Sequence, residues 1–255
     1  MLSDAQLERY GRQILLHRFD VAGQESLLAA SVLLVGLGGL GSPAALYLAS
    51  AGVGRLLLAD GDCVELSNLQ RQIAHGEADL GVNKARSAAA AIAALNSETQ
   101  VEVIETRLVA ADLPAILQSV DLVVDASDNY PVRFALNRAC IAAGIPLVSA
   151  AAVRAEGQLA VFDPVRGGPC YRCLYAEGEA QTALSCSDSG VLAPVVGVLG
   201  ALQAMEAIKI LSGFGDALRG RLLQLDLSSM DITTLKLAPR PDCPDCAAVQ
   251  RKAAP

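Results

Sequence analysis

Residues 32–41 read Val-Leu-Leu-Val-Gly-Leu-Gly-Gly-Leu-Gly, an apolar run that leads directly into a cluster of glycines. The first four residues are typical of a buried strand, and the apolar segment after the glycines favours a helix. Gly36, Gly38 and Gly41 leave backbone N–H groups open at the N-terminus of that helix, where a phosphate can bind. Asp60 follows Gly41 by 19 residues, at the end of the next apolar run, where dinucleotide-binding folds place the acid that holds a ribose. The stretch therefore predicts a nucleotide-binding strand–turn–helix unit.

Length and charge limit the classes of partner. The chain has 255 residues, of which 53% are hydrophobic, and a formal net charge of −7. The length and composition suffice for one well-buried core. Non-specific binding to nucleic acid or to an acidic membrane depends on a positive protein field, so we expect neither partner. Charged residues near the N-terminus replace the unbroken apolar segment of a signal peptide, which predicts a cytoplasmic location.

Two long uncharged segments require a choice between a membrane span and a buried element. Residues 26–54 contain six glycines and Pro43, which interrupt a span, so we expect a buried strand, turn and helix there. Residues 189–205 contain three glycines and Pro194 and fit a core helix better than a span. Neither segment therefore predicts a membrane protein.

Apolar strands and helical segments alternate along most of the chain, which is typical of a doubly wound, mostly parallel, Rossmann-like α/β sheet. Residues 151–255 add antiparallel strands and a crossover loop, and no Pro/Ser/Gly-rich linker separates them from residues 1–150, so we expect one continuous compact unit. The expected strands are 32–35, 55–59, 101–105, 122–126, 146–150, 158–162, 221–227 and 231–237. The expected helices are 3–19, 24–30, one ending at 50, 83–95, 112–119, 132–143 and one ending near 211.

Two cations follow Asp60 in an order that a simple dinucleotide-binding domain does not need. Arg71 lies 11 residues and Lys84 lies 24 residues after it. When a carboxylate attacks the α-phosphate of ATP, negative charge builds on the phosphate oxygens and on the departing pyrophosphate, and fixed cations lower the barrier. Both residues are therefore candidates for adenylylation chemistry, against the alternative that each is a solvated surface cation. The glycines and Asp60 alone would also suit an NAD-dependent oxidoreductase.

Asp128 and Asn129 directly follow the expected strand 122–126. They therefore lie at the carboxyl end of a parallel strand, where ligands of open α/β sheets bind. A carboxylate in that place can hold the Mg²⁺ that bridges the phosphates of ATP. The alternative is that Asp128 caps the helix that begins near Pro131.

The chain contains seven cysteines, and four of them form two Cys-x-x-Cys pairs separated by 69 residues. Four thiolates can surround a structural Zn²⁺ ion as a closed tetrahedral site, whereas two disulfides or redox-active pairs are the alternatives. Cys63 and Cys140 are expected to be small buried residues. His17 and His75 show no spacing typical of a metal site or a catalytic triad, and we expect both at the surface. The four cysteines of the two Cys-x-x-Cys pairs, which are the expected zinc ligands, are Cys170, Cys173, Cys243 and Cys246.

The motifs that carry a family resemblance are Arg9 to Gln13, Gly36 to Gly41, Asp60 to Asp62, Ser67 to Gln72, Lys84, Ser127 to Asn129, Gly157-Gln158, Pro169 to Cys173, Gly190 to Lys209 and Cys243 to Cys246. In this order and nearly from end to end, the chain resembles the ThiF/MoeB/HesA family of ubiquitin-activating-enzyme-like adenylyltransferases. The resemblance implies that Asp60 binds the ribose and Asp128 serves Mg²⁺. The implied ATP-binding residues are Gly36, Gly38, Gly39, Gly41, Asp60, Asp62, Ser67, Asn68, Arg71, Lys84, Asp128 and Asn129.

The resemblance also implies the reaction. The terminal Gly-Gly carboxylate of a ubiquitin-like sulfur-carrier protein becomes an acyl-adenylate with release of pyrophosphate. A thiocarboxylate then forms for molybdopterin or thiamin biosynthesis. Few residues follow Cys246, so we expect a separate sulfur donor and no attached sulfurtransferase domain. A non-catalytic adaptor for ubiquitin-like tails is the alternative.

Two further residues take their roles from the resemblance alone. Arg12 matches an arginine that enters the ATP site of a neighbouring subunit, which implies a homodimer. Cys186 matches a loop cysteine that forms covalent intermediates in some relatives. No Lys, Arg or His lies close to Cys186 in sequence to lower the pKa of its thiol. A loop cysteine without a covalent role is therefore favoured over covalent catalysis at Cys186.

Overall fold

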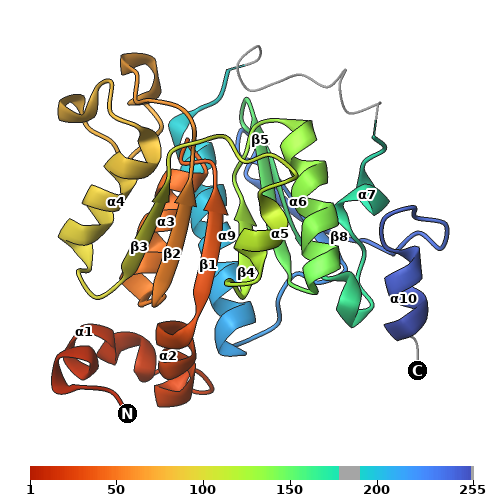
Figure 1. Cartoon of the computed structure of the whole chain (residues 1–255), viewed down its shortest axis with the longest axis horizontal. Helices are drawn as coiled ribbons and strands as arrows, with labels where there is room; N and C mark the ends of the chain where they lie inside the picture. The colour runs from red at the N-terminus through yellow and green to blue at the C-terminus, as the bar shows by residue number, and fades with distance from the viewer. Residues whose placement is uncertain (178–189, 254–255) are drawn as a thin grey trace.

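The computed structural model describes residues 1–177 and 190–253 and shows one eight-stranded sheet with helices on both faces (Figure 1). The strand order is β3-β2-β1-β4-β5-β6-β7-β8. The first five strands in this order are parallel, and β6, β7 and β8 are antiparallel to their neighbours. The strands are β1 (Ser31–Val35), β2 (Arg55–Ala59), β3 (Gln100–Ile104), β4 (Leu122–Asp125), β5 (Leu147–Val153), β6 (Glu156–Phe162), β7 (Arg221–Asp226) and β8 (Asp231–Lys236). The predicted doubly wound sheet with an antiparallel extension is confirmed.

The helices divide into two layers because each face of the sheet has its own apolar cluster. One face is covered by α3 (Gly41–Ala51), α4 (Lys84–Leu95) and α9 (Ala193–Ser212). The other is covered by α5 (Leu113–Leu117), α6 (Tyr130–Ala143) and α7 (Tyr171–Leu174). At the ends of the chain lie α1 (Asp4–Ile14), α2 (Asp20–Ala29) and α10 (Ala247–Ala253). Three short 3₁₀ helices complete the described elements: η1 (Leu66–Asn68), η2 (Glu77–Asp79) and η3 (Pro164–Arg166).

The N-terminal helix shows where sequence signals fixed a boundary and where they did not. The expected start at residue 3 is confirmed by a capping box, because Ser3 Oγ accepts from the Gln6 N–H at 3.2 Å and Gln6 Oε1 accepts from the Ser3 N–H at 3.0 Å. The helix ends at Ile14 and not at residue 19, and the next begins at Asp20 and not at residue 24. Between the two helices, Arg18 has a φ of +73°, a left-handed conformation that turns the chain before α2.

Helix α9 is the one described helix that is long and apolar enough to cross a membrane. Its buried face includes Val195 and Leu199, which belong to the core cluster on the α3 side of the sheet. The buried Gln203 on the same face donates Nε2 to the Asp125 carbonyl oxygen at 2.8 Å. The helix therefore packs on the sheet as the core helix that we expected.

The parallel strands reverse their order between β1 and β4. In this topology the chain leaves β1 toward one face and β4 toward the other, which opens a crevice at their carboxyl ends. The glycine turn follows β1 and Asp128 follows β4, so both reach this crevice. Strand β5 runs through residue 150, and the sheet continues without interruption into β6.

Candidate nucleotide site and metal centre

The glycine turn after β1 leaves no room for side chains. Gly36 has a φ of +89°, and a Cβ atom on Gly41 would lie 1.8 Å from the Gly36 carbonyl oxygen. A Cβ atom on Gly39 would lie 2.9 Å from Val196 of α9. The backbone N–H groups of Gly38 and Gly39 bond to no other backbone group in the described part of the chain. They are open to an anion at the start of α3, which agrees with the prediction for Gly38. The prediction is wrong for Gly36, whose N–H donates to the Ala59 carbonyl oxygen at 2.9 Å, so this glycine serves the close packing of the turn.

Asp60, at the end of β2, braces this turn. Its Oδ2 accepts a hydrogen bond from the Leu37 N–H at 2.7 Å, and its Oδ1 accepts one from the Asp62 N–H at 2.9 Å. The carboxylate is only partly buried, so it remains accessible from the crevice. Asp60 therefore lies where a ribose-binding acid must lie in this topology.

Lys84 is buried, and its surface-cation alternative is wrong. The residue is 8% exposed, and its Nζ lies 3.4 Å from Asp62 Oδ2. Asn83 sets this position, because its Oδ1 accepts from the Ala85 and Arg86 N–H groups and so caps α4. The Asn83 Nδ2 also donates to the Asp60 carbonyl oxygen at 2.9 Å, which ties the start of α4 to the end of β2.

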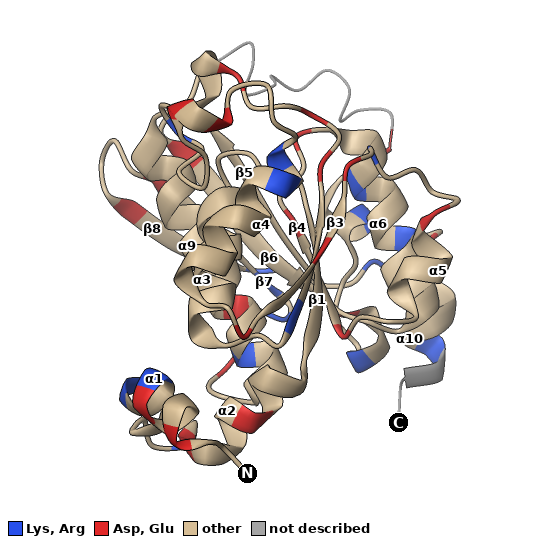
Figure 2. Ribbon diagram, turned by 60° about the vertical axis from the view of Figure 1, so that its left-hand side comes forward, with Lys and Arg blue, Asp and Glu red and all other residues tan. Residues whose placement is uncertain are grey.

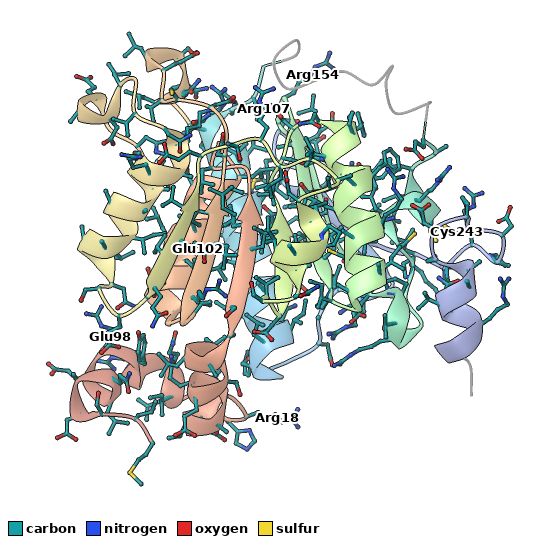
Figure 3. All side chains as sticks on the ribbon, viewed as in Figure 1. Arg18, Glu98, Glu102, Arg107, Arg154 and Cys243 are labelled. Carbon is teal, nitrogen blue, oxygen red and sulfur yellow. The ribbon has the colours of Figure 1, made fainter. Side chains whose placement is uncertain are left out.

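Arg107, which sequence reasoning missed, joins the same group. Its Nη2 donates to Asp62 Oδ1 at 2.7 Å, so Asp62 lies between two cations. The hydrogen bond from Arg107 holds the pKa of Asp62 below its usual value. Figure 3 shows Arg107 at the carboxyl edge of the strands. The sequence did contain a signal for Arg107, because this residue follows the end of β3 just as Asp128 follows the end of β4, and both therefore lie at the carboxyl edge of the sheet.

The segment from Ser67 to Gln72 crosses below the glycine turn. Asn68 is buried, Ser67 is exposed, and Arg71 is half-buried with its Nη1 donating to the Ser67 carbonyl oxygen at 3.1 Å. The Gln72 Nε2 lies 3.5 Å from the place that a Cβ atom on Gly38 would take. This packing brings Arg71 to the neighbourhood of the turn.

Asn129, and not Asp128, caps α6. The Asn129 Oδ1 accepts from the Val132 N–H at 3.0 Å. Asp128 is exposed and makes no hydrogen bond or ion pair within residues 1–177 and 190–253. The helix-cap alternative for Asp128 is therefore wrong. Its carboxylate is exposed at the edge of the sheet, where its charge helps to raise the pKa of Arg107.

A buried network that the sequence did not reveal fixes the turn before Asp128. Arg133 donates from Nη2 to the carbonyl oxygens of Ser127 and Ala150. Asp125 accepts from the Ser127 and Ser149 hydroxyl groups at 2.6 and 2.8 Å. Because these groups come from three separate segments, they hold the end of β4 in one conformation.

His75 is buried, and the prediction that both histidines lie at the surface is wrong for it. Its Nδ1 lies 2.8 Å from Ser87 Oγ and its Nε2 lies 2.9 Å from the Leu37 carbonyl oxygen. Burial lowers the pKa of the imidazole below its ordinary value of 6.5. The ring is therefore neutral at pH 7.

This lowered pKa predicts a contribution to the pH dependence of stability. The unfolded chain takes up a proton on His75 near pH 6.5, while the folded chain resists it. The free energy of unfolding should therefore fall as the pH decreases through 6.5, and it should fall less in His75→Gln. Urea unfolding of both proteins at about pH 7.5 and about pH 5.5 measures the difference. An equal loss in the two proteins would contradict the expectation.

The four paired cysteines meet in one cluster. Their Sγ atoms lie within 4.8 Å of one another, with separations of 3.9 Å for Cys170–Cys173, 3.6 Å for Cys170–Cys243 and 3.5 Å for Cys173–Cys246. Four sulfurs at about 2.3 Å from a tetrahedral Zn²⁺ would be about 3.8 Å apart, so the cluster has the required size. It lies between α7 and α10, where Figure 3 labels Cys243. The donor set and geometry fit zinc.

Two N–H groups donate hydrogen bonds to sulfur atoms of this cluster. The Arg240 N–H donates to Cys173 Sγ at 3.4 Å, and Gln250 Nε2 donates to Cys246 Sγ at 3.1 Å. The hydrogen bond between Cys170 and Cys173 lowers the pKa of Cys173 and raises that of Cys170, while burial raises the pKa of Cys246, so without an ion the charge concentrates on Cys173. Asp245, inside the second Cys-x-x-Cys turn, accepts from Asn137 Nδ2 of α6 and from Arg172 Nη1, each at 3.0 Å. All four ligand positions would be filled by protein, which indicates a structural ion.

A match to the ThiF family covers residues 10–245. The chain belongs to the ThiF family. It is 48% identical over 245 residues to molybdopterin-synthase adenylyltransferase of Escherichia coli (strain K12), covering 96% of this chain and 98% of the relative. It is 46% identical to the SAMP-activating enzyme E1 of Haloferax volcanii, covering 96% and 90%. Against adenylyltransferase and sulfurtransferase MOCS3 of Bos taurus it is 49% identical, covering 96% of this chain and 54% of the relative.

Solved structures show the same fold. The structure of E. coli MccB with ATP matches 93% of this ThiF-family chain and 73% of its own, with a TM-score of 0.82 and 26% identity. The complex of MccB with MccA-N7isoASN matches 96% and 76%, with a TM-score of 0.83 and 25% identity. The architecture derived above is therefore shared over almost all of the chain.

The remaining predicted residues of this ThiF-family chain have different outcomes. Cys140 is buried as expected, whereas Cys63 is exposed, because the residues after β2 run along the surface. Cys186 lies outside the described residues. Arg12 is exposed on α1, and Figure 1 shows α1 at the end of the sheet opposite the glycine turn. Arg12 therefore does not reach the nucleotide crevice of its own chain.

Proposed function

We propose that this ThiF-family chain is an ATP-dependent adenylyltransferase that activates the terminal carboxylate of a ubiquitin-like sulfur-carrier protein. The observation that carries the proposal is the convergence of open glycine N–H groups, Asp60 and the buried Lys84 at the carboxyl edge of β1 and β2. The named activities of the bacterial and archaeal relatives support it. We also propose a cytoplasmic location and a separate sulfur donor.

The reaction follows from the charges at this edge. A carboxylate oxygen of the carrier attacks the α-phosphorus of ATP, the bond from that phosphorus to the bridging oxygen breaks, and pyrophosphate leaves. The N–H groups of Gly38 and Gly39 would bind phosphate oxygens, while Lys84 and Arg71 would stabilise the charge that develops on them. Asp60 would hold the ribose. Ser67, Asn68, Asp62 and Asn129 complete the proposed nucleotide contacts.

Asp128 would hold the Mg²⁺ that accompanies ATP. Its carboxylate is exposed and makes no hydrogen bond or ion pair among the described residues, although its charge acts on Arg107, whereas Asp62 forms ion pairs with both Lys84 and Arg107. Oxygen ligands from one carboxylate and from the substrate phosphates are the usual set for this ion. Bound Mg²⁺ neutralises charge on the phosphates.

A homodimer would complete the site with Arg12 of a second copy. Two features support it. Arg12 lies at the end of the sheet away from its own crevice, and the outer surface of α3 and α9 exposes apolar side chains in an uncharged region that Figure 2 shows in tan. Tyr47, Val198 and Met205 on this surface are 55%, 40% and 38% exposed. Apolar surface of this kind is typical of a subunit interface.

Mixed dimers test this arrangement. Arg12→Ala and Arg71→Ala should each be inactive alone, since every site lacks one arginine. In an equal mixture, about half of the dimers contain one copy of each, and one of their two sites is complete. Activity should therefore return to about a quarter of the wild-type value. No recovery in a mixture shown to exchange subunits would contradict a shared site.

The adenylylation itself can be observed directly. The pure protein, ATP and Mg²⁺ are incubated with each candidate carrier, and the carrier is weighed by mass spectrometry. A mass increase equal to one AMP on a carrier that ends in Gly-Gly, and none on a carrier without its last glycine, is the expected result. A chain that binds the carrier and adds no AMP would be an adaptor.

A further inference from the structure

The N–H and the carbonyl group of Leu37 are each held by a side chain from another part of the chain, Asp60 and His75. Its N–H donates to Asp60 Oδ2 at 2.7 Å, and its carbonyl oxygen lies 2.9 Å from His75 Nε2. The Ser42 hydroxyl also points to this carbonyl oxygen at the longer distance of 3.3 Å. Leu37 and His75 are 0% and 8% exposed, so water does not compete for the bond between these two residues.

The geometry of a trans peptide makes this contact important for the ligand. The carbonyl group of Leu37 and the N–H group of Gly38 belong to the same planar unit and point in opposite directions. Because His75 draws the carbonyl oxygen toward the protein interior, the Gly38 N–H points away from the interior. That N–H is one of the open donors of the turn.

The second nitrogen of His75 connects the turn to α4. A carbonyl oxygen only accepts hydrogen bonds, so Nε2 must carry the proton in the neutral ring, and Nδ1 then accepts from the Ser87 hydroxyl at 2.8 Å. Ser87 lies on α4 one turn after Lys84, on the same face of the helix. One imidazole therefore links the glycine turn to the helix that carries the buried cation.

We propose that His75 is a positioning residue that fixes the Gly38 N–H toward the phosphates of ATP and holds this donor in register with Lys84. The inference rests on the proposed function, since it concerns the same nucleotide. His75 does not touch the reacting atoms. Its contribution is to keep the turn in the binding conformation before ATP arrives.

Two matched variants separate this role from packing. Glutamine can place its Nε2 near the position of His75 Nε2 and keep the bond to Leu37, whereas asparagine reaches only the position of Nδ1 and keeps the bond to Ser87. Each loses the ring and one hydrogen bond. ATP affinity, measured by titration calorimetry, should fall about tenfold in His75→Asn and less than about threefold in His75→Gln. Ser87→Ala should resemble His75→Gln, and His17→Ala, which changes the other histidine, should match the wild type.

Equal ATP affinities for the two variants, at equal loss of thermal stability, would overturn the proposal and leave His75 a packing residue. Should His75→Asn fail to fold, the ¹⁵N spectrum of histidine-labelled wild type decides the matter. A proton on Nε2 with Nδ1 accepting supports the proposal, and the opposite tautomer overturns it. Wild-type protein that does not bind ATP would refute the proposed function. Wild-type protein that binds ATP, with equal affinities for the two His75 variants, would refute only the role of His75.

Discussion

Replacing Lys84 with alanine should lower carrier-dependent ATP–pyrophosphate exchange by about 10²- to 10³-fold, the usual cost of removing one fixed group that stabilises transition-state charge. The cation is buried at the start of α4, and within residues 1–177 and 190–253 its one ion pair is with Asp62, whose charge is shared with Arg107. The loss should appear mainly in kcat, because charge builds on the phosphates as pyrophosphate departs. Exchange of radioactive pyrophosphate into ATP measures it.

Arg86 provides the matched control for this experiment. It lies two residues further along α4, is exposed, and pairs with Glu105 on the surface. Arg86→Ala should keep exchange within about twofold of the wild type, because exposed ion pairs contribute little. Equal activity of Lys84→Ala and Arg86→Ala would remove Lys84 from the site and leave the adenylyltransferase assignment without its central residue.

Replacing Cys243 with serine should cost on the order of 3 to 5 kcal/mol of folding free energy and lower the thermal midpoint by about 10 °C. The four sulfurs lie within 4.8 Å of one another and join the C-terminal segment to the turn before α7. Loss of one thiolate opens the closed tetrahedral set and weakens this connection. Elemental analysis should find one zinc per chain in the wild type and far less in the variant.

Cys63→Ser is the control for the metal experiment. Cys63 is exposed and lies outside the cluster, so this variant should keep its zinc and its thermal midpoint. A wild-type chain that holds no zinc, with a Cys243→Ser variant of unchanged stability, would contradict a structural metal centre.

The sequence predicted the sheet well because each strand is a short apolar run between clear turn residues. The expected strand 55–59 matches β2, and Asn83 caps α4 as the start of the expected helix 83–95. These features depend on neighbours in sequence. The early end of α1 at Ile14 carries no such local signal, because no glycine or proline lies between Ile14 and Asp20.

The site was predicted where it depends on order along the chain and missed where it depends on distant partners. Glycine spacing and the cysteine pairs are local patterns, and they indicated the turn and the metal cluster. His75 bonds to a residue 38 positions away, and Arg107 bonds to one 45 positions away. No local pattern reports such contacts, so His75 was assigned to the surface. Its burial follows from packing of the segment after Asn68 below the glycine turn.

Helix α6 has a practical consequence for biochemists who treat this protein with chelators. Its first turn is capped by Asn129, next to Asp128. In its middle, Asn137 donates a hydrogen bond to Asp245, which lies inside the second Cys-x-x-Cys pair. Helix α6 therefore connects the cysteine cluster to the edge of the sheet where Asp128 lies. Removal of Zn²⁺ from the cysteine cluster should loosen the position of α6 and, with it, the segment around Asp128. Inactivation by a chelator would therefore not show that the ion takes part in the reaction.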